Sequence, residues 1–212
     1  LAITTASSGI VNRSAFSTQP VIEVQDESGN RVADATTSIV VTASAGNGAT
    51  LSGTTTINAV NGIADFAVNP SGLKLSGAVG TYRLTFAKTG GGLTAATQDV
   101  ALTPAAANSI SITTSAAGAV SGVDLTTQPI VKVIDIDGNT ITSGTGSDAT
   151  IAATLTGGSA SISGTTSVQS VNGVATFTNL RVTGTAASYT LNFAVTTPAS
   201  LNTCSPYTWS AW

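Results

Sequence analysis

Few side chains in this sequence could carry chemistry. Its 212 residues include no His, one Cys and 10 Asp and Glu residues. Without His there is no imidazole for a Ser-His or Cys-His nucleophile pair and no HExxH zinc site. The acidic residues are scattered, mostly in expected turns, whereas glycoside hydrolysis needs two carboxylates about 5–10 Å apart in a cleft. The sequence therefore predicts a protein that is not an enzyme and has no catalytic residue.

The strongest candidate for a metal site is a short loop with Asp135, Asp137 and Asn139. Oxygen-bearing side chains at alternate positions are typical of calcium loops, and Ca²⁺ takes six to eight oxygen ligands. The competing interpretation is an Asp-capped hairpin turn, in which the carboxylate accepts bonds from nearby backbone N–H groups. A matching segment, residues 26–30, has Ser28 where Asp137 stands, and this favours the turn. No other cofactor is expected.

Aromatic residues gather at the end of the chain. The last six positions contain both Trp residues and one of the three Tyr residues, namely Tyr207, Trp209 and Trp212. Aromatic anchors concentrate binding energy in interfaces, and an extended segment can add as a strand to an open sheet edge. Residues 201–212 are thus either a docking element, for a second copy or for other subunits of an extracellular assembly, or the last strand of a domain. A disordered or truncated end is the third alternative.

The segments that would position these residues occur twice in the chain. The repeated segments are Ser17–Pro20 and Thr126–Pro129, Val60–Phe66 and Val171–Phe177, and Tyr82–Phe86 and Tyr189–Phe193. Self-similarity at a spacing of roughly 110 residues indicates two copies of one structural unit. We expect one domain over residues 1–104, a second over 105–200, and the aromatic tail over 201–212.

Each copy has the pattern of β-strands. Ile22 and Val24 alternate with polar residues, and Tyr82, Leu84 and Phe86 do the same. Such alternation places one face of a strand in a core and the other toward solvent. Asn-Gly pairs separate the strands, because both residues tolerate the positive φ of tight turns. No segment has a sustained helical period. Tyr82, like its counterpart Tyr189, is expected to bond back to the chain through its hydroxyl, as in a tyrosine corner.

The motifs resemble a known family in their order and spacing. Val131–Asn139 is similar to the V-x-V-x-D-x-x-G-N hairpin of bacterial immunoglobulin-like domains of group 1, the invasin/intimin type. Ala160–Gly164, followed by Val171–Phe177, resembles the A-x-L-S-G and N-G-x-A-x-F stretch of that family, and Tyr189–Leu191 resembles its G-x-Y-x-L strand. The resemblance implies an all-β fold of two tandem immunoglobulin-like antiparallel β-sandwiches in series. In that family such domains stack as stiff rods on bacterial surfaces.

Composition excludes several other function classes. Seven Lys and Arg residues against 10 acidic ones give a net charge of −3, which excludes a protein built to neutralise nucleic-acid phosphates. No apolar run is long enough for membrane insertion. With the resemblance, this predicts a non-catalytic structural or interaction module, a rod-like spacer of a bacterial cell-surface adhesin or extracellular appendage.

Two alternative functions stay open. The same sandwiches could form a decoration or fibre protein on the surface of a virus or phage particle. They could also be a carbohydrate-binding accessory domain, which needs an exposed aromatic platform. Tyr207, Trp209 and Trp212 are the residues that could supply it.

Overall fold

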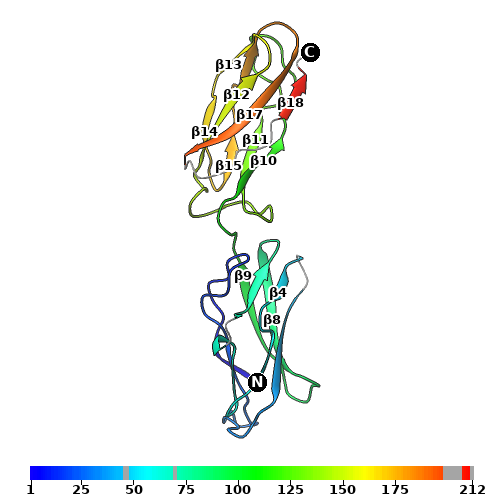
Figure 1. Ribbon diagram of the computed structural model, residues 1–212, viewed down its shortest axis with the longest axis vertical. Helices are drawn as coiled ribbons and strands as arrows, with labels where there is room; N and C mark the ends of the chain where they lie inside the picture. Colours follow the sequence, from blue (N-terminus) through cyan, green and yellow to red (C-terminus); the bar gives the residue numbers. More distant parts are fainter. Residues whose placement is uncertain (45–47, 69–70, 198–206, 211–212) are drawn as a thin grey trace. The chain divides into compact units, whose positions relative to one another are not determined.

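The chain folds into two β-structured units, each with its own core. The computed structural model describes residues 1–44, 48–68, 71–197 and 207–210 (Figure 1). The two compact units are Leu1–Ala105 and Ala106–Trp212. Buried apolar side chains form one cluster in each unit. The expectation of an all-β fold of two immunoglobulin-like sandwiches is therefore confirmed.

In the first unit nine strands are described, with one short 3₁₀ helix, η1 (Phe66–Val68), between β6 and β7. The strands are β1 (Ala2–Thr5), β2 (Val21–Glu23), β3 (Ser38–Ala43), β4 (Thr50–Ser52), β5 (Thr56–Asn58), β6 (Ile63–Asp65), β7 (Lys74–Ser76), β8 (Gly80–Lys88) and β9 (Ala96–Leu102). They form a three-stranded sheet of order β1-β2-β6, a four-stranded sheet of order β5-β3-β8-β9, and the pair β4-β7.

The second unit repeats this topology strand for strand. Its described strands are β10 (Ser109–Thr114), β11 (Ile130–Ile134), β12 (Thr150–Thr156), β13 (Ser161–Ser163), β14 (Ser167–Gln169), β15 (Val174–Thr176), β16 (Arg181–Thr183), β17 (Ser188–Thr197) and β18 (Tyr207–Ser210). The sheets have the orders β10-β11-β15, β14-β12-β17-β18 and β13-β16. The internal repeat of the sequence is thus a repeat of structure.

Alternation along the strands builds each core. In β8, Tyr82, Leu84 and Phe86 are fully buried, while Arg83 between them is exposed. Phe86 packs edge-on against Phe66, with ring centroids 5.9 Å apart. In the second unit Phe177 and Phe193 make the equivalent contact at 5.2 Å. Ile22 and Val24 are buried as well, so the core faces predicted from the sequence are confirmed.

The Asn-Gly pairs form tight hairpin turns. Asn61 and Gly62 have φ angles of 51° and 78°, and Asn172 and Gly173 have 49° and 74°. Two consecutive positive φ angles define the type I′ turn that matches the twist of antiparallel strands. Gly62 is also required sterically, because an added Cβ would collide with the carbonyl oxygen of Val32. The turn residues predicted from the sequence are therefore confirmed.

Candidate functional site

The loop predicted as the best metal candidate forms a hydrogen-bonded turn. One carboxylate oxygen of Asp135 accepts bonds from the backbone N–H groups of Asp137 and Asn139, each at 2.9 Å. The side-chain amide of Asn139 donates to both carboxylate oxygens, at 3.1 and 3.0 Å. These bonds are those of the Asp-capped hairpin turn. Within the described residues no group of three or more His, Cys, Asp or Glu could hold a metal ion. Calcium at this loop stays a prediction.

The first unit builds the same turn around Asp26. Its carboxylate accepts the backbone N–H groups of Ser28 and Asn30 at 2.9 Å, and the Asn30 side-chain amide at 3.2 Å. The backbone N–H of Asn30, followed by its side-chain amide, holds the pKa of the Asp26 carboxyl below its usual value. Ser28 fills the position of Asp137 and contributes the same backbone donor. The turn therefore needs no second acidic residue.

The aromatic tail contains the strand β18, which pairs antiparallel with β17. Tyr207 lies opposite Leu191, and Trp209 lies opposite Tyr189. In the first unit β9 pairs with β8 in the same way, and Val100 lies opposite Tyr82. The backbone of Tyr207–Ser210 thus takes the place of the last strand of the sandwich. Trp212 lies outside the described residues, and docking of a partner by these three aromatic residues stays a prediction.

The two buried tyrosines hold their own strands in place. The hydroxyl of Tyr82 donates to the carbonyl oxygen of Ala78, and that of Tyr189 donates to Thr185, each at 2.6 Å. Both rings are almost completely buried, with exposed fractions of 0% and 1%. Each hydroxyl bonds to the backbone four residues upstream, as in a tyrosine corner. These residues stabilise the fold and offer no group to a ligand.

Each unit has an Arg–Asp ion pair between neighbouring segments of its described residues, and the sequence did not reveal either pairing. Arg83 on β8 binds both carboxylate oxygens of Asp99 on β9, at 2.7 and 2.9 Å. The hydrogen bond from Arg83, followed by its charge, holds the pKa of the Asp99 carboxyl below its usual value. In the second unit Nε of Arg181 lies 2.9 Å from Oδ1 of Asp124. The Arg83–Asp99 pair is exposed, so solvent screens it strongly. In the second pair the side chains are partly exposed, but the two contacting atoms are buried.

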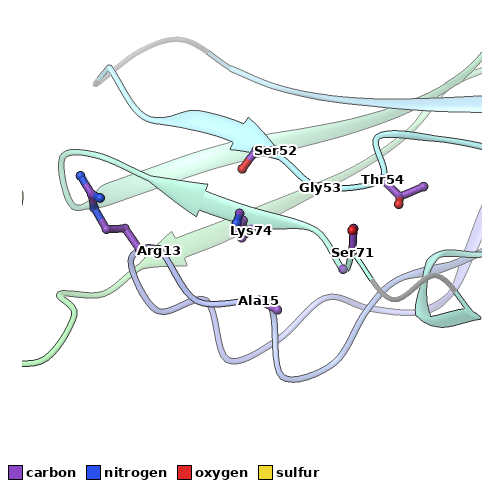
Figure 2. Close-up of a pocket in the computed structure, with 8 residues that line it drawn as sticks. Arg13, Ala15, Ser52, Gly53, Thr54, Ser71 and Lys74 are labelled. Atoms are coloured by element: carbon purple, nitrogen blue, oxygen red, sulfur yellow. The ribbon is translucent and has the colours of Figure 1, made fainter.

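A groove on the first unit brings together residues that sequence reasoning missed (Figure 2). It has a volume of about 790 Å³ and contains two cationic residues, Arg13 and Lys74. The other lining residues are small or hydroxylated: Ala15, Ser52, Gly53, Thr54, Ser71 and Gly72. A bond from the Thr54 N–H to the Ser71 carbonyl, at 2.7 Å, ties two of the lining segments together. Comparing the two repeats position by position is the signal that could have found this groove.

Comparison with known proteins yields similar folds only at low identity. No protein-family model and no curated protein matches this chain. Among solved structures, it is similar to the D0-D1 domain of intimin, at 18% identity over 99% of both chains with a TM-score of 0.34. Invasin, a bacterial integrin-binding protein, is 17% identical over 99% of this chain and 39% of its own, with a TM-score of 0.36.

A β-glycosidase from Bacteroides vulgatus is similar at 12% identity over 83% of this chain, with a TM-score of 0.42. The chain spans only 21% of the length of that glycosidase. With TM-scores below 0.5 and identities below 25%, these likenesses carry no argument about activity, ligand or partner.

Proposed function

We propose that this chain is a non-catalytic structural and interaction module. It acts as a rod-like spacer in a bacterial cell-surface adhesin or another extracellular appendage. The partners of such a module are other protein subunits of the assembly or a second copy, reached through the C-terminal tail. A spacer has to keep its fold while tension pulls on its two ends. The feature that supports this role is the way the first unit joins its entering segment to its leaving segment.

The entering and leaving segments of the first unit are bonded to each other in parallel. Val11 and Thr103 form a parallel bridge. The N–H of Asn12 donates to the Thr103 carbonyl at 2.9 Å, and the N–H of Thr103 donates to the Ile10 carbonyl at 3.0 Å. The Thr103 hydroxyl adds a bond to the Ile10 carbonyl at 3.1 Å. Together these bonds close the unit between its first and last segments.

Parallel pairing decides how this closure responds to force. Because the two segments run in the same direction, pulling the ends of the unit apart slides one segment along the other. The bonds are then loaded together instead of one after another. Asn12 is also fixed from the side, since its buried side chain accepts the N–H of Gly77 at 2.9 Å. The first unit is therefore built to resist extension along the chain.

Four of the described aspartates are occupied with structural tasks. Asp26 and Asp135 cap turns, while Asp99 and Asp124 form ion pairs with arginines. The sequence holds no imidazole to act as a general base. No helix in the described ranges is long and apolar enough to cross a membrane. A module of this composition, placed outside the cell, transmits force without turning over a substrate.

Single-molecule extension by atomic force microscopy tests this function. We expect two separate unfolding events, each releasing at most roughly 350–380 Å of chain, from about 105 residues at 3.3–3.6 Å each. Thr103→Pro removes the N–H that donates to Ile10 and should lower the unfolding force of one event. Thr97→Val, an exposed change on β9, is the matched control. A single merged event, or equal forces in the Thr103→Pro and control variants, would contradict the proposal.

A further inference from the structure

The two units differ in charge at one pair of bridged surface positions. In the second unit Asp124 and Arg181 lie opposite each other as bridge partners, and their side chains form an ion pair. In the first unit the same bridge joins Ala15 to Lys74. The cation is kept, but its carboxylate partner is replaced by a methyl group. The second unit therefore neutralises this cation internally, and the first unit does not.

Lys74 lies in the middle of the groove of the first unit. Ala15 lies on one side of it, and Ser52 of β4 lies opposite it on the other side. The side chain is exposed, and no ion pair to it occurs in the described part of the chain. Figure 2 shows Lys74 between these neighbours, with Arg13 at one end of the groove. The groove is thus a cationic site in a protein of net charge −3.

The rest of the lining supplies hydrogen-bonding groups and little apolar surface. Hydroxyls come from Ser52, Thr54 and Ser71, and Ala15 offers only a methyl group. A Cβ on Gly53 would collide with the Gly72 carbonyl, so the segments that contain these two glycines lie too close together for a side chain at position 53. Hydroxyls both donate and accept hydrogen bonds. A volume of about 790 Å³ lies within the range of roughly 300–1,000 Å³ that is usual for small-ligand sites.

The two units also differ at Arg13, which lies at one end of the groove. Its φ is 65°, in the left-handed region that disfavours residues with a Cβ. The equivalent position in the second unit is Gly122, with φ of 79°. The backbone N–H of Arg13 donates to the Leu75 carbonyl, and that of Gly122 donates to the Val182 carbonyl, each at 2.9 Å. The first unit thus has an arginine where the second unit has glycine, and the proposed contact with a carboxylate depends on Lys74 alone.

We propose that this groove of the first unit binds an acidic saccharide. A sugar carboxylate takes the place beside Lys74 that Asp124 takes beside Arg181 in the second unit. The described lining of the groove has no aromatic platform on which a sugar ring could stack, so binding depends on the charge of Lys74 and on hydrogen bonds. The sugar hydroxyls bond to Ser52, Thr54 and Ser71, which suit a polyhydroxylated ligand better than an acidic peptide with apolar side chains. This site is separate from the aromatic tail and does not depend on the spacer function.

Titration followed by nuclear magnetic resonance tests the proposal on the full chain. The probe is a short oligogalacturonate, and its methyl-esterified form is the neutral control of equal length. We expect the carboxylated probe alone to shift the amide signals of residues 52–54 and 71–74. Lys74→Gln should weaken binding by up to about fivefold, the effect of losing one partly screened ion pair. Ala15→Asp, which recreates the internal pair of the second unit, should have the same effect.

Lys88→Gln is the matched control, because it removes the same charge from β8 and Lys88 does not line the groove. Binding that survives both Lys74→Gln and Ala15→Asp would overturn the proposal. Equal binding of the methyl ester would show that the carboxylate makes no contribution, and this result would also overturn the proposal. A poly-glutamate peptide that binds as well as the sugar would show that the groove recognises charge alone, and the saccharide assignment would then be wrong. No binding of the oligogalacturonate at millimolar concentration would likewise refute it.

Discussion

Replacing Tyr82 by Phe changes a single hydrogen bond in the first unit. The ring is fully buried, and Phe has the same ring, so the packing against the core is kept. Only the hydroxyl is lost, together with its 2.6 Å bond to the Ala78 carbonyl. Tyr189→Phe removes the equivalent 2.6 Å bond to Thr185 from the second unit. The two substitutions are therefore matched perturbations of two separate cores.

The expected cost follows from the surroundings of the acceptors. Both acceptors belong to exposed residues, Ala78 and Thr185, and the two hydrogen bonds are only partly buried. The loss should then be close to the net value of a hydrogen bond, about 1 kcal/mol, without the added cost of a buried unpaired acceptor. For a unit of this size, about 1 kcal/mol lowers the melting temperature by roughly 4–8 °C.

Hydrogen exchange read by mass spectrometry separates the two units in the intact chain. In Tyr82→Phe, the slowest amides of β3 and β8 should exchange about fivefold faster, since 1 kcal/mol is about a fivefold change in the unfolding equilibrium. Those of β12 and β17 should keep their rates. Tyr189→Phe should give the reverse pattern, and the double variant the sum, because the sites belong to different cores. Equal acceleration of both units by either substitution would refute the view that each sandwich is held by its own core.

Two further predictions concern pH and the tail. The pKa values of Asp26 and Asp99 are lowered in the folded chain, so their contribution to stability is present above the unfolded pKa of about 3.9 and is lost as pH falls through the folded values. Urea midpoints measured from pH 7 to 2 should therefore fall below about pH 4, and Asp99→Asn should make this fall shallower; an unchanged curve would contradict the ion-pair argument. Deleting residues 198–212 removes β18 and uncovers the edge of β17, so the second unit should lose stability and the truncated chain should self-associate. Light scattering and urea unfolding check this, and a deletion that abolishes an assembly of the intact chain without destabilising the unit would favour a docking tail over a last strand.

Local patterns in the sequence were enough to predict the strands and turns. The alternation of Tyr82, Leu84 and Phe86 identifies their common buried face, since side chains on a strand alternate with a period of two. Asn61-Gly62 specifies its turn, because both residues tolerate positive φ. The repetition of both signals about 110 residues later predicts a second sandwich. These features depend only on residues close together in the chain.

The groove could not be predicted in the same way. Ala15 and Lys74 are 59 positions apart, and nothing in either local segment shows that they become bridge partners. Their counterparts, Asp124 and Arg181, are 57 positions apart, and most acidic residues were expected only to occupy turns. A side chain's charge is visible in the sequence, but its electrostatic partner depends on which strands become neighbours. The Asp135 loop was better predicted, because the donors to its carboxylate lie within four residues.

The sequence by itself determined the class of fold, the twofold repetition and the lack of an imidazole, because these depend on composition and short-range periodicity. Tertiary structure alone decided that Val11 meets Thr103 in parallel, that Tyr207–Ser210 completes the second sandwich, and that Lys74 lies in a groove without a carboxylate beside it in the described chain. The physical reason is that strand pairing joins residues tens of positions apart. Which charges and hydrogen-bonding groups meet is therefore fixed only when the sheets close around their cores.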